Sequence, residues 1–440
     1  AVAHLASAAV VVPGATAAPP PARGPAPKYV ILFIMDSLRA DRLRLFNPKA
    51  RPETPTWDAL GKTSAVFLDT FVQGNESRVS HASIWTSLYS INHGLTVANN
   101  TNIDLKWTTV DEVAKSANLY TVGISANGFV DPVKHNSGQR WDHFSNHIHK
   151  EIGLRGEDIL EAGVAVVKDR KEPWFLYLGT VDTHVSWRAK EPWMSKYDVP
   201  GYKGRFAKTF SGGDAGSAKK LGISDAEKQH VRALYDSNVS YQDDLLKQLL
   251  AKLDEWGIAD QTMLIITGDH GDEQWEKGRV GHGGSVYDAL VHVPLLVHYP
   301  ALLPAGMYRP GAEVIDIVPT IADALGVKAD DRWQGQSLIP LANGEHADYA
   351  RLTVSTPAMS MLGAKVGKWK MIASGGGAVE LYDTSSDPTE DHDLAGKAPV
   401  GQRLVADALW QLRGHNAEWK KSRWGNPANV TAEYAKAMGE

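Results

Sequence analysis

The sequence predicts an α/β fold with a mostly parallel central sheet, followed by a smaller C-terminal α+β subdomain with an antiparallel sheet. Short uninterrupted apolar runs, typical of strands buried on both faces, recur along most of the chain. Segments with apolar residues at helical spacing lie between these runs. From about residue 346 the pattern changes to short alternating runs, which indicates a second, smaller unit.

The first expected strand covers residues 29–35, an apolar run that stops at Asp36. It is too short for a typical helix and is rich in β-branched and aromatic residues. The same pattern predicts further strands at residues 121–124, 174–178, 262–266 and 293–297.

Helical spacing of apolar residues predicts helices over residues 109–117, 158–167 and 231–256. The last of these ends before Gly257, a residue typical of helix ends. Since strands and helices alternate, we expect helices on both faces of the sheet.

The last part of the chain contains alternating runs at residues 351–354, 369–372 and 379–382, with a glycine-rich turn at 375–377. A helix is expected from about 401 to 419. The sequence therefore predicts a catalytic domain over residues 29–345 and a subdomain over residues 346–440.

Residues 1–28 form a flexible segment rich in alanine and proline, with two interpretations. The apolar residues 5–13, followed by small residues, resemble the remnant of a signal peptide, which favours an extracytoplasmic location. The proline-rich composition also fits a linker. No other run reaches the roughly 18 apolar residues that span a bilayer, so no membrane span is expected in this piece.

Composition excludes several classes of function. The chain has no cysteine, which excludes disulfides, thiolate metal sites and a cysteine nucleophile. Its net charge is −5 and its basic residues are scattered, so a nucleic-acid partner is not expected.

Ionisable residues follow three of the expected strands. Asp36 follows the first strand, His184 follows residues 174–178, and Asp269 and His270 follow residues 262–266. The carboxyl ends of parallel strands meet at one edge of a sheet, so we expect these side chains to lie close together. Carboxylate and imidazole ligands together are typical of a divalent cation site.

Each of these residues also has a purely structural interpretation. A single aspartate after a strand is more often a helix cap, and His184 or His282 alone could be a surface histidine. Their shared position at one sheet edge favours a functional site. We expect Arg39 and Asp41 to form a local pair, and Asp272 and Glu273 to face solvent.

A set of segments in a fixed order resembles the sulfatase family of the alkaline phosphatase superfamily. It covers roughly residues 29–395 and consists of residues 36–41, 55–60, 77–94, 175–184, 267–271, 281–295, 316–320, 335–338 and 380–388. The nucleophile segment of the family is similar to Ser77-Arg-Val-Ser-His-Ala-Ser-Ile-Trp-Thr86. The resemblance implies an alkaline-phosphatase-like three-layer sandwich and hydrolysis of a sulfuric or phosphoric ester.

The resemblance also implies roles for individual residues. Asp36, Asp269 and His270, together with Ser77, would hold the metal, and Ser77 is the nucleophile. His184 and His282 would be catalytic and contact the transferred group. His81 falls where sulfatases carry the arginine that supports the nucleophile, and it is expected to bind substrate.

The chemistry of the residues supports these roles independently. A serine hydroxyl needs a base or a metal to become a good nucleophile, and one divalent cation provides this activation. A site with histidine and few oxygen ligands favours manganese or zinc, while calcium and magnesium remain open. A helix expected near Ser80 would add N-terminal amides that favour an anion.

Two departures from the family pattern affect the chemistry. Val79 and His81 differ from the proline or alanine and the arginine that accompany formylglycine formation, so formylglycine is not expected. Ser37 replaces the second aspartate usual in sulfatases, and the remaining ligands resemble those of lipoteichoic-acid-synthase-like phosphoglycerol transferases. A phosphate ester is therefore favoured over a sulfate ester.

Three functions remain open at this point. They are a hydrolase of a small-molecule, glycan-linked or lipid-linked ester, a phosphoglycerol- or phosphoethanolamine-type transferase, and an inactive binding domain. The presence of Ser77 and all proposed ligands favours an enzyme. Oligomeric state and natural substrate are not determined by the sequence.

Overall fold

The computed structural model describes residues 24–95, 102–344, 352–355 and 361–424. Most of the predicted N-terminal segment 1–28, and the predicted boundary near residue 345, lie outside these ranges. Among the described residues, no helix combines the length and apolar character needed to cross a membrane.

A mixed central sheet confirms the predicted α/β architecture. Its strands run in the order β12-β2-β11-β8-β1-β5-β3-β4, and β13 also pairs with β2. The strands are β1 (Tyr29–Met35), β2 (Ala65–Phe71), β3 (Tyr120–Ser125), β4 (His143–Asn146), β5 (Trp174–Thr180), β8 (Thr262–Thr267), β11 (His292–His298), β12 (Gly306–Tyr308) and β13 (Ala312–Glu313).

Strand β11 runs antiparallel to both of its neighbours, β8 and β2, whereas the other pairs in the sheet are parallel. The chain leaves β8 at the carboxyl edge and passes through β9 (Glu273–Gln274), β10 (Val280–Gly281) and the short α10 (Asp288–Val291). No long crossover helix carries it back to the opposite edge, so β11 enters the sheet where β8 left it.

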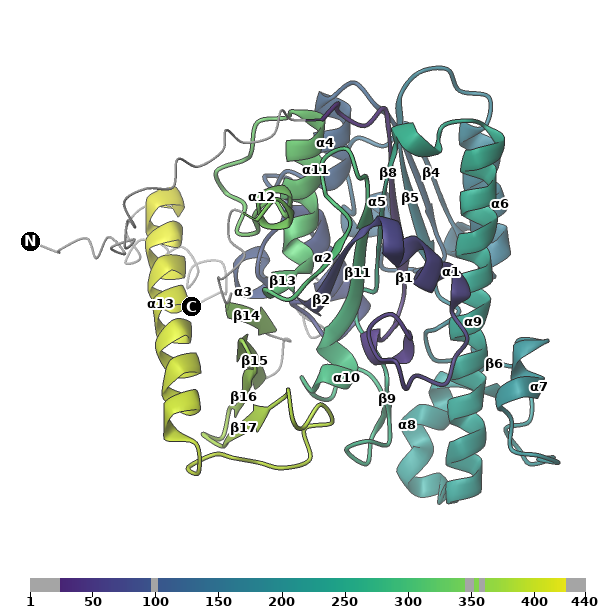
Figure 1. Ribbon diagram of the computed structural model, residues 1–440, viewed down its shortest axis with the longest axis vertical. Helices are drawn as coiled ribbons and strands as arrows, with labels where there is room; N and C mark the ends of the chain where they lie inside the picture. Colours follow the sequence, from purple (N-terminus) through teal and green to yellow (C-terminus); the bar gives the residue numbers. More distant parts are fainter. Residues whose placement is uncertain (1–23, 96–101, 345–351, 356–360, 425–440) are drawn as a thin grey trace, which may run out of the picture.

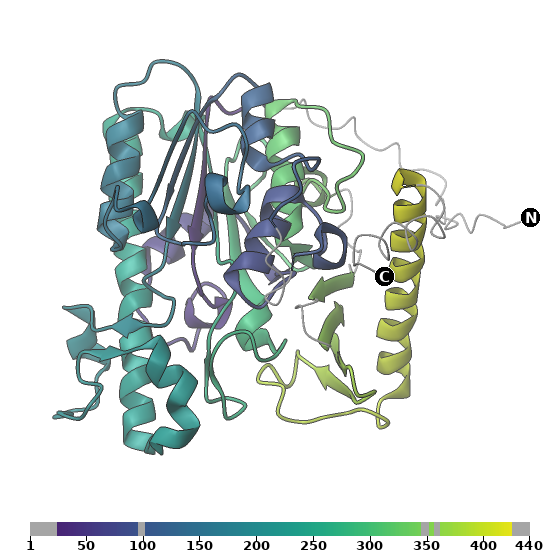
Figure 2. The same cartoon turned by 180° about the vertical axis from the view of Figure 1, so that it is seen from behind.

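Helices cover both faces of the sheet, as predicted (Figure 1 and Figure 2). Alternate residues of β1 point to opposite faces, so Val30 and Leu32 join one apolar core while Ile31 and Phe33 join the other. The first core packs against α2 (Ser77–Thr86), α4 (Val110–Ser116) and α11 (Ile317–Leu325), and the second against α6 (Gly156–Val167) and α9 (Asp225–Glu255).

Shorter elements complete this part of the chain. The helices are α1 (Pro55–Leu60), α3 (Ser90–His93), α5 (Pro132–His135), α7 (Trp193–Tyr197), α8 (Gly212–Leu221) and α12 (Ile339–Ala342); the 3-10 turns are Ala40–Arg42, Gly61–Thr63, His147–His149, Ala259–Gln261 and Val314–Asp316; β6 (Trp187–Arg188) pairs with β7 (Thr209–Phe210).

The expected C-terminal sheet is also present. Strands β14 (Leu352–Ser355), β15 (Met361–Val366), β16 (Trp369–Ser374) and β17 (Val379–Asp383) form an antiparallel sheet in that order. The long helix α13 (Pro399–Trp424) packs on this sheet, at the left of Figure 1, and buries Val405 and Leu409 against it.

Candidate active site

Four neighbouring parallel strands deliver polar side chains to one edge of the sheet. Asp36 directly follows β1, and Asp269 and His270 follow β8. His184 lies beyond β5, and Asn127 lies just beyond β3. Because these strands are adjacent in the order β8-β1-β5-β3, residues distant in sequence meet at their carboxyl ends.

Ser77, the first residue of α2, lies among the predicted ligands. Its Oγ donates to Asp36 Oδ2 at 3.2 Å and lies 3.2 Å from His270 Nε2. His270 Nε2 is also 3.6 Å from Asp36 Oδ1 and 3.6 Å from Asp269 Oδ2. The structure thus brings together Asp36, Ser77, Asp269 and His270.

Neighbouring groups hold the two carboxylates in place. Ser37 adopts a left-handed conformation with φ of 60°, and its backbone N–H donates to Asp269 Oδ1 at 3.0 Å. Ser37 Oγ donates to Asp36 Oδ1 at 3.1 Å, and Asn127 Nδ2 donates to Asp36 Oδ2 at 2.7 Å. Asn127 was missed in the sequence, although its position just after an expected strand was the available signal.

The donor atoms fit one divalent cation. Asp36, Asp269 and His270 are buried and carry ligand atoms that all lie within 4.8 Å of one another. Asp269 Oδ2 is buried and lies 3.3 Å from His81 Nδ1 and 3.6 Å from His270 Nε2. Although burial opposes ionisation, the charges of His270 and His81 hold the pKa of Asp269 below its usual range. The site thus offers a buried, ionised carboxylate oxygen beside the two histidine rings.

His81 lies beneath this group of ligands. Its Nδ1–H donates to the Ser77 carbonyl oxygen at 2.9 Å and is 3.3 Å from Asp269 Oδ2. Burial lowers the pKa of His81, but the hydrogen bond to Asp269 and the negative charges of Asp269 and Asp36 together outweigh burial, and the net shift is upward. These contacts make His81 a support for Ser77 and Asp269, and its predicted contact with substrate stays a prediction.

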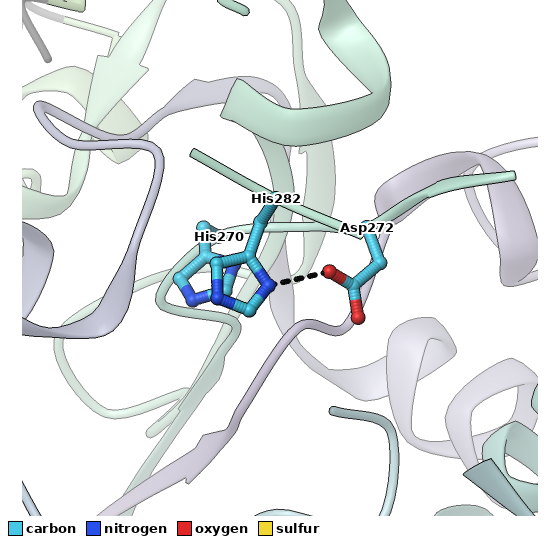
Figure 3. Close-up of side chains that lie close together, drawn as sticks. All are labelled: His270, Asp272 and His282. Atoms are coloured by element: carbon cyan, nitrogen blue, oxygen red, sulfur yellow. Dashed lines mark hydrogen bonds and ion pairs between the residues drawn. The ribbon is translucent and has the colours of Figure 1, made fainter. Parts of the chain in front are cut away.

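His184 and His282 lie side by side near His270. The ring centroids of His184 and His282 are 4.8 Å apart, and those of His270 and His282 are 4.5 Å apart. Figure 3 shows His282 beside His270, with Asp272 on its other side. The two predicted catalytic histidines therefore lie beside His270, one of the predicted metal ligands.

Asp272 was predicted to face solvent, and this prediction is wrong. Its side chain is fully buried, and Glu273 is 1% exposed. Asp272 Oδ1 accepts from His282 Nδ1 at 2.7 Å, and Oδ2 accepts from the backbone N–H of Val185 at 3.1 Å (Figure 3). One carboxylate therefore fixes His282 and the loop that carries His184.

His270, Asp272 and His282 also have the composition of a second metal site, with ligand atoms within 4.8 Å. Both ring nitrogens of His270 are already engaged, however. Nε2 faces Ser77, and Nδ1 donates to the Gly271 carbonyl at 2.9 Å. The Asp272–His282 hydrogen bond therefore supports the histidine, and the geometry favours a single cation site.

Helix α2 begins at Ser77 and not near Ser80, so its N-terminal amides lie at the nucleophile. They are not free for an anion, because the Glu76 carboxylate accepts from the backbone N–H groups of Arg78 and Val79, each at 3.0 Å. The expected anion-binding role of this helix end is thus taken by a side chain of the protein itself.

The predicted pair of Arg39 and Asp41 is confirmed by a hydrogen bond of 2.8 Å from Arg39 Nε to Asp41 Oδ1. Arg39 also reaches towards the active site. Its Nη1 donates to the backbone carbonyl of Asp272 at 2.9 Å, so this buried arginine helps to hold the loop after His270.

The site opens into a cavity of about 750 Å³, here called the active-site cavity. Asp36, Ser77, His184 and His282 are among the residues that line it. The rest of the lining comes from α5, β6, α9 and the segments after β3, β4 and β5: Asn127, Gly128, Phe129, Lys134, His135, Ile148, Leu154, Arg155, Val181, Asp182, Val185, Ser186, Arg188, Ala189, Lys190 and Asn238, with Glu76 and Ala126.

Two family profiles match this chain. The profile described as Sulfatase matches residues 28–327, which is well over half of the chain. The profile described as N-sulphoglucosamine sulphohydrolase, C-terminal, matches residues 282–413.

Curated relatives match over about half of the chain. The choline-sulfatase of Rhizobium meliloti is 27% identical over 222 residues, which is 46% of this chain and 42% of the relative. Arylsulfatase K of Xenopus laevis is 28% identical over 240 residues, which is 48% of this chain and 45% of the relative. The matched region thus spans less than half the length of these relatives.

Solved structures share the fold over most of the chain. The phosphonate monoester hydrolase of Agrobacterium radiobacter has a TM-score of 0.71 at 19% identity and covers 88% of this chain and 96% of its own. The structure of BT4656 in complex with D-glucosamine-2-N,6-O-disulfate has a TM-score of 0.72 at 17% identity and covers 91% and 100%. Profile, relatives and fold agree: the chain belongs to the sulfatase family of the alkaline phosphatase superfamily.

Proposed function

We propose that this protein is a metal-dependent hydrolase that cleaves a phosphoric ester, in preference to a sulfuric ester, through attack by an unmodified Ser77. The observation that carries the proposal is the position of Ser77 Oγ, 3.2 Å from both Asp36 Oδ2 and His270 Nε2. This placement sets the hydroxyl against two predicted metal ligands, where a bound cation would lower its pKa.

Asp36, Asp269 and His270 would hold one divalent cation, with Ser77 beside it, and manganese or zinc suits this donor set best. When bound, the ion supplies positive charge that lowers the pKa of the serine hydroxyl and offsets charge on the ester oxygens. The chain itself orients the nucleophile. Asp36 accepts the hydroxyl hydrogen bond, and Asn127 and Ser37 fix the carboxylate that accepts it.

The reaction then proceeds by two displacements. Ser77 Oγ loses its proton and forms a bond to phosphorus as the bond from phosphorus to the alcohol oxygen breaks, and one proton is taken up by the leaving alcohol, so that the step balances. Water next attacks the phosphoserine, which releases phosphate and restores the hydroxyl. His184 and His282 line the cavity beside Ser77 and are the side chains placed to donate hydrogen bonds to the ester oxygens.

The preference for phosphorus follows from the unmodified serine. Val79 and His81 stand where the formylglycine context has other residues, so elimination of sulfate from a hydrated aldehyde is not expected. A serine ester must instead be released by attack of water on the transferred group, which is routine at phosphorus. The named activities of the curated relatives make a sulfuric ester the alternative substrate.

The test is turnover of matched p-nitrophenyl sulfate, phosphate and phenylphosphonate by wild type, Ser77→Ala and Ser116→Ala. Ser116 is an exposed serine at the end of α4 and provides the control. We expect the phosphorus esters to be preferred and Ser77→Ala to lose at least roughly a hundredfold in kcat/KM, as for loss of a nucleophile. Near-normal turnover by Ser77→Ala would refute the assignment.

A further inference from the structure

The lining of the active-site cavity carries an excess of positive charge. Four basic side chains line it, namely Lys134, Arg155, Arg188 and Lys190, against the carboxylates Asp36, Glu76 and Asp182. The whole chain has the opposite balance, with a net charge of −5. Positive charge is thus concentrated at this opening of an acidic protein.

All three carboxylates are engaged. Asp36 belongs to the metal ligands, and Glu76 accepts from the helix amides of Arg78 and Val79. Asp182 accepts from Lys190 Nζ at 2.6 Å. Each carboxylate that lines the cavity thus already has a role or a partner within the protein.

Two of the basic residues are also neutralised. Lys190 is paired with Asp182, and Arg155 with Glu157 at 3.0 Å and Asp158 at 2.7 Å. Within the described parts of the chain, the side chains of Arg188 and Lys134 have no ion pair and no hydrogen bond. Both are exposed, and they come from different elements, β6 and α5.

The cavity has room for more than the reacting group. Its volume of about 750 Å³ lies in the range of sites for substrates the size of a sugar or larger. Phe129, 46% exposed, Ile148 and Val185 give it apolar wall between the charged residues. Phe129 is its one aromatic residue other than histidine, whereas quaternary ammonium groups are held by cages of several aromatic rings.

We infer that the alcohol portion of the ester carries a second anionic group, such as a carboxylate, sulfate or phosphate, which Arg188 and Lys134 bind. The inference rests on the proposed hydrolase function and adds its substrate class. A cationic alcohol such as choline would meet like charge here.

The experiment compares two esters that differ in one charge, using the meta and para isomers of carboxyphenyl and carbamoylphenyl phosphate (or sulfate, if the sulfuric ester is the one hydrolysed). The measured quantity is the ratio of kcat/KM for the carboxylate to kcat/KM for the amide. Comparing this ratio between enzymes cancels the intrinsic reactivity of each ester. The variants are Arg188→Gln, Lys134→Gln, the double variant, the charge-retaining Arg188→Lys, and Arg403→Gln as a control.

We expect wild type to prefer the carboxylate, and Arg188→Gln to reduce the ratio about three- to tenfold, as for loss of one charge-assisted contact at a partly solvated site. The loss should appear in KM, increase in the double variant, and shrink with added salt. Arg188→Lys should keep most of the preference. Arg403 is exposed on α13 and does not line the cavity, so Arg403→Gln should match wild type.

An unchanged ratio in the double variant, or equal losses for both esters, would overturn the inference. The two proposals also fail separately. Wild type that hydrolyses both esters equally well refutes the anionic class and leaves the hydrolase intact. Wild type that hydrolyses neither ester, nor the p-nitrophenyl esters, refutes the hydrolase.

Discussion

The Ser77 hydroxyl touches two of the three predicted metal ligands, and each of those ligands is itself held by a second group. Asp36 accepts from Asn127, and His270 Nδ1 donates to the Gly271 carbonyl. Such outer contacts set the orientation of ligands and nucleophile before substrate arrives. At the scale of single residues, the sharpest prediction therefore concerns Asp272, which holds His282 and is not one of the predicted metal ligands.

Asp272→Asn should lower kcat about ten- to a hundredfold and leave KM nearly unchanged, as for loss of an outer partner of a catalytic group. The amide cannot accept from both His282 Nδ1 and the Val185 N–H, so at least one histidine loses its fixed position. Steady-state kinetics with nitrophenyl and alkyl esters check this, and the alkyl ester should suffer more because its alcohol leaves less readily. Asp225→Asn, on the exposed start of α9, is the control.

A rise in KM with kcat unchanged would assign Asp272 to substrate binding. Equal losses for both esters would contradict its action through a proton-donating histidine.

The grouping of Asp36, Asp269 and His270 could be predicted from the sequence because strand ends converge by geometry. Asp36 follows an apolar run directly, Asp269 and His270 follow one after Thr267 and Gly268, and this pattern is local. Ser77 was found by the family resemblance instead. Asp272 could not be found in this way. Its partners, His282 and Val185, lie in two other segments, and only the packed structure shows that they surround it.

At the scale of elements, helix α2 carries the predicted nucleophile as its first residue and has an unusual N-cap residue. Glu76, and not a serine or an aspartate, caps the helix beside Ser77. Its carboxylate is 8% exposed and accepts two backbone N–H groups that no helical carbonyl can reach.

Glu76→Ala should reduce the free energy of unfolding by about 1 kcal/mol, the usual cost of a lost helix cap. Urea denaturation of the variant and wild type measures this difference. Glu255→Ala, at the solvated end of α9, should change stability by much less. Equal effects of the two substitutions would show that the cap contacts contribute nothing particular.

Elements with uniform apolar runs were predicted well, and elements without them were missed. Strands β1, β5 and β8 match their predicted ranges within two residues. Strand β2 was missed because Asp69 and Thr70 interrupt its apolar run, and the edge strand β4 because His-Phe-Ser-Asn carries no such run. The reversed direction of β11 depends on the path of the connection and leaves no mark in the composition of the strand itself.

At the scale of the whole molecule, the buried Lys370 connects the C-terminal sheet to α10, the short helix before β11. Lys370 on β16 pairs with Asp288, which begins α10, at 2.5 Å and with Glu390 at 2.6 Å. Burial, opposed by Lys370 and reinforced by Asp288, raises the pKa of Glu390 to about 7. Helix α10, which follows the segment that carries His270 and His282, is thus attached to the C-terminal sheet through Lys370, which is shared by two carboxylates.

This arrangement predicts a pH-dependent stability. A carboxyl group whose pKa is raised in the folded state contributes stability that is fully present below its unfolded pKa and is lost as the pH rises through the folded value. Relative to Glu390→Gln, wild type should therefore lose free energy of unfolding between about pH 5 and pH 8. Urea denaturation across this range measures the difference, and parallel curves for the two proteins would contradict it.

The most direct test of the central claim is the mass of the Ser77 peptide, from resting enzyme and from enzyme quenched in acid during turnover of a phosphate ester. The account predicts an ordinary serine in the resting protein and a fraction of peptide carrying one phosphoryl group at Ser77 after quenching. A resting peptide lighter by two hydrogen atoms, or a phosphoryl group found only on another residue, would contradict it.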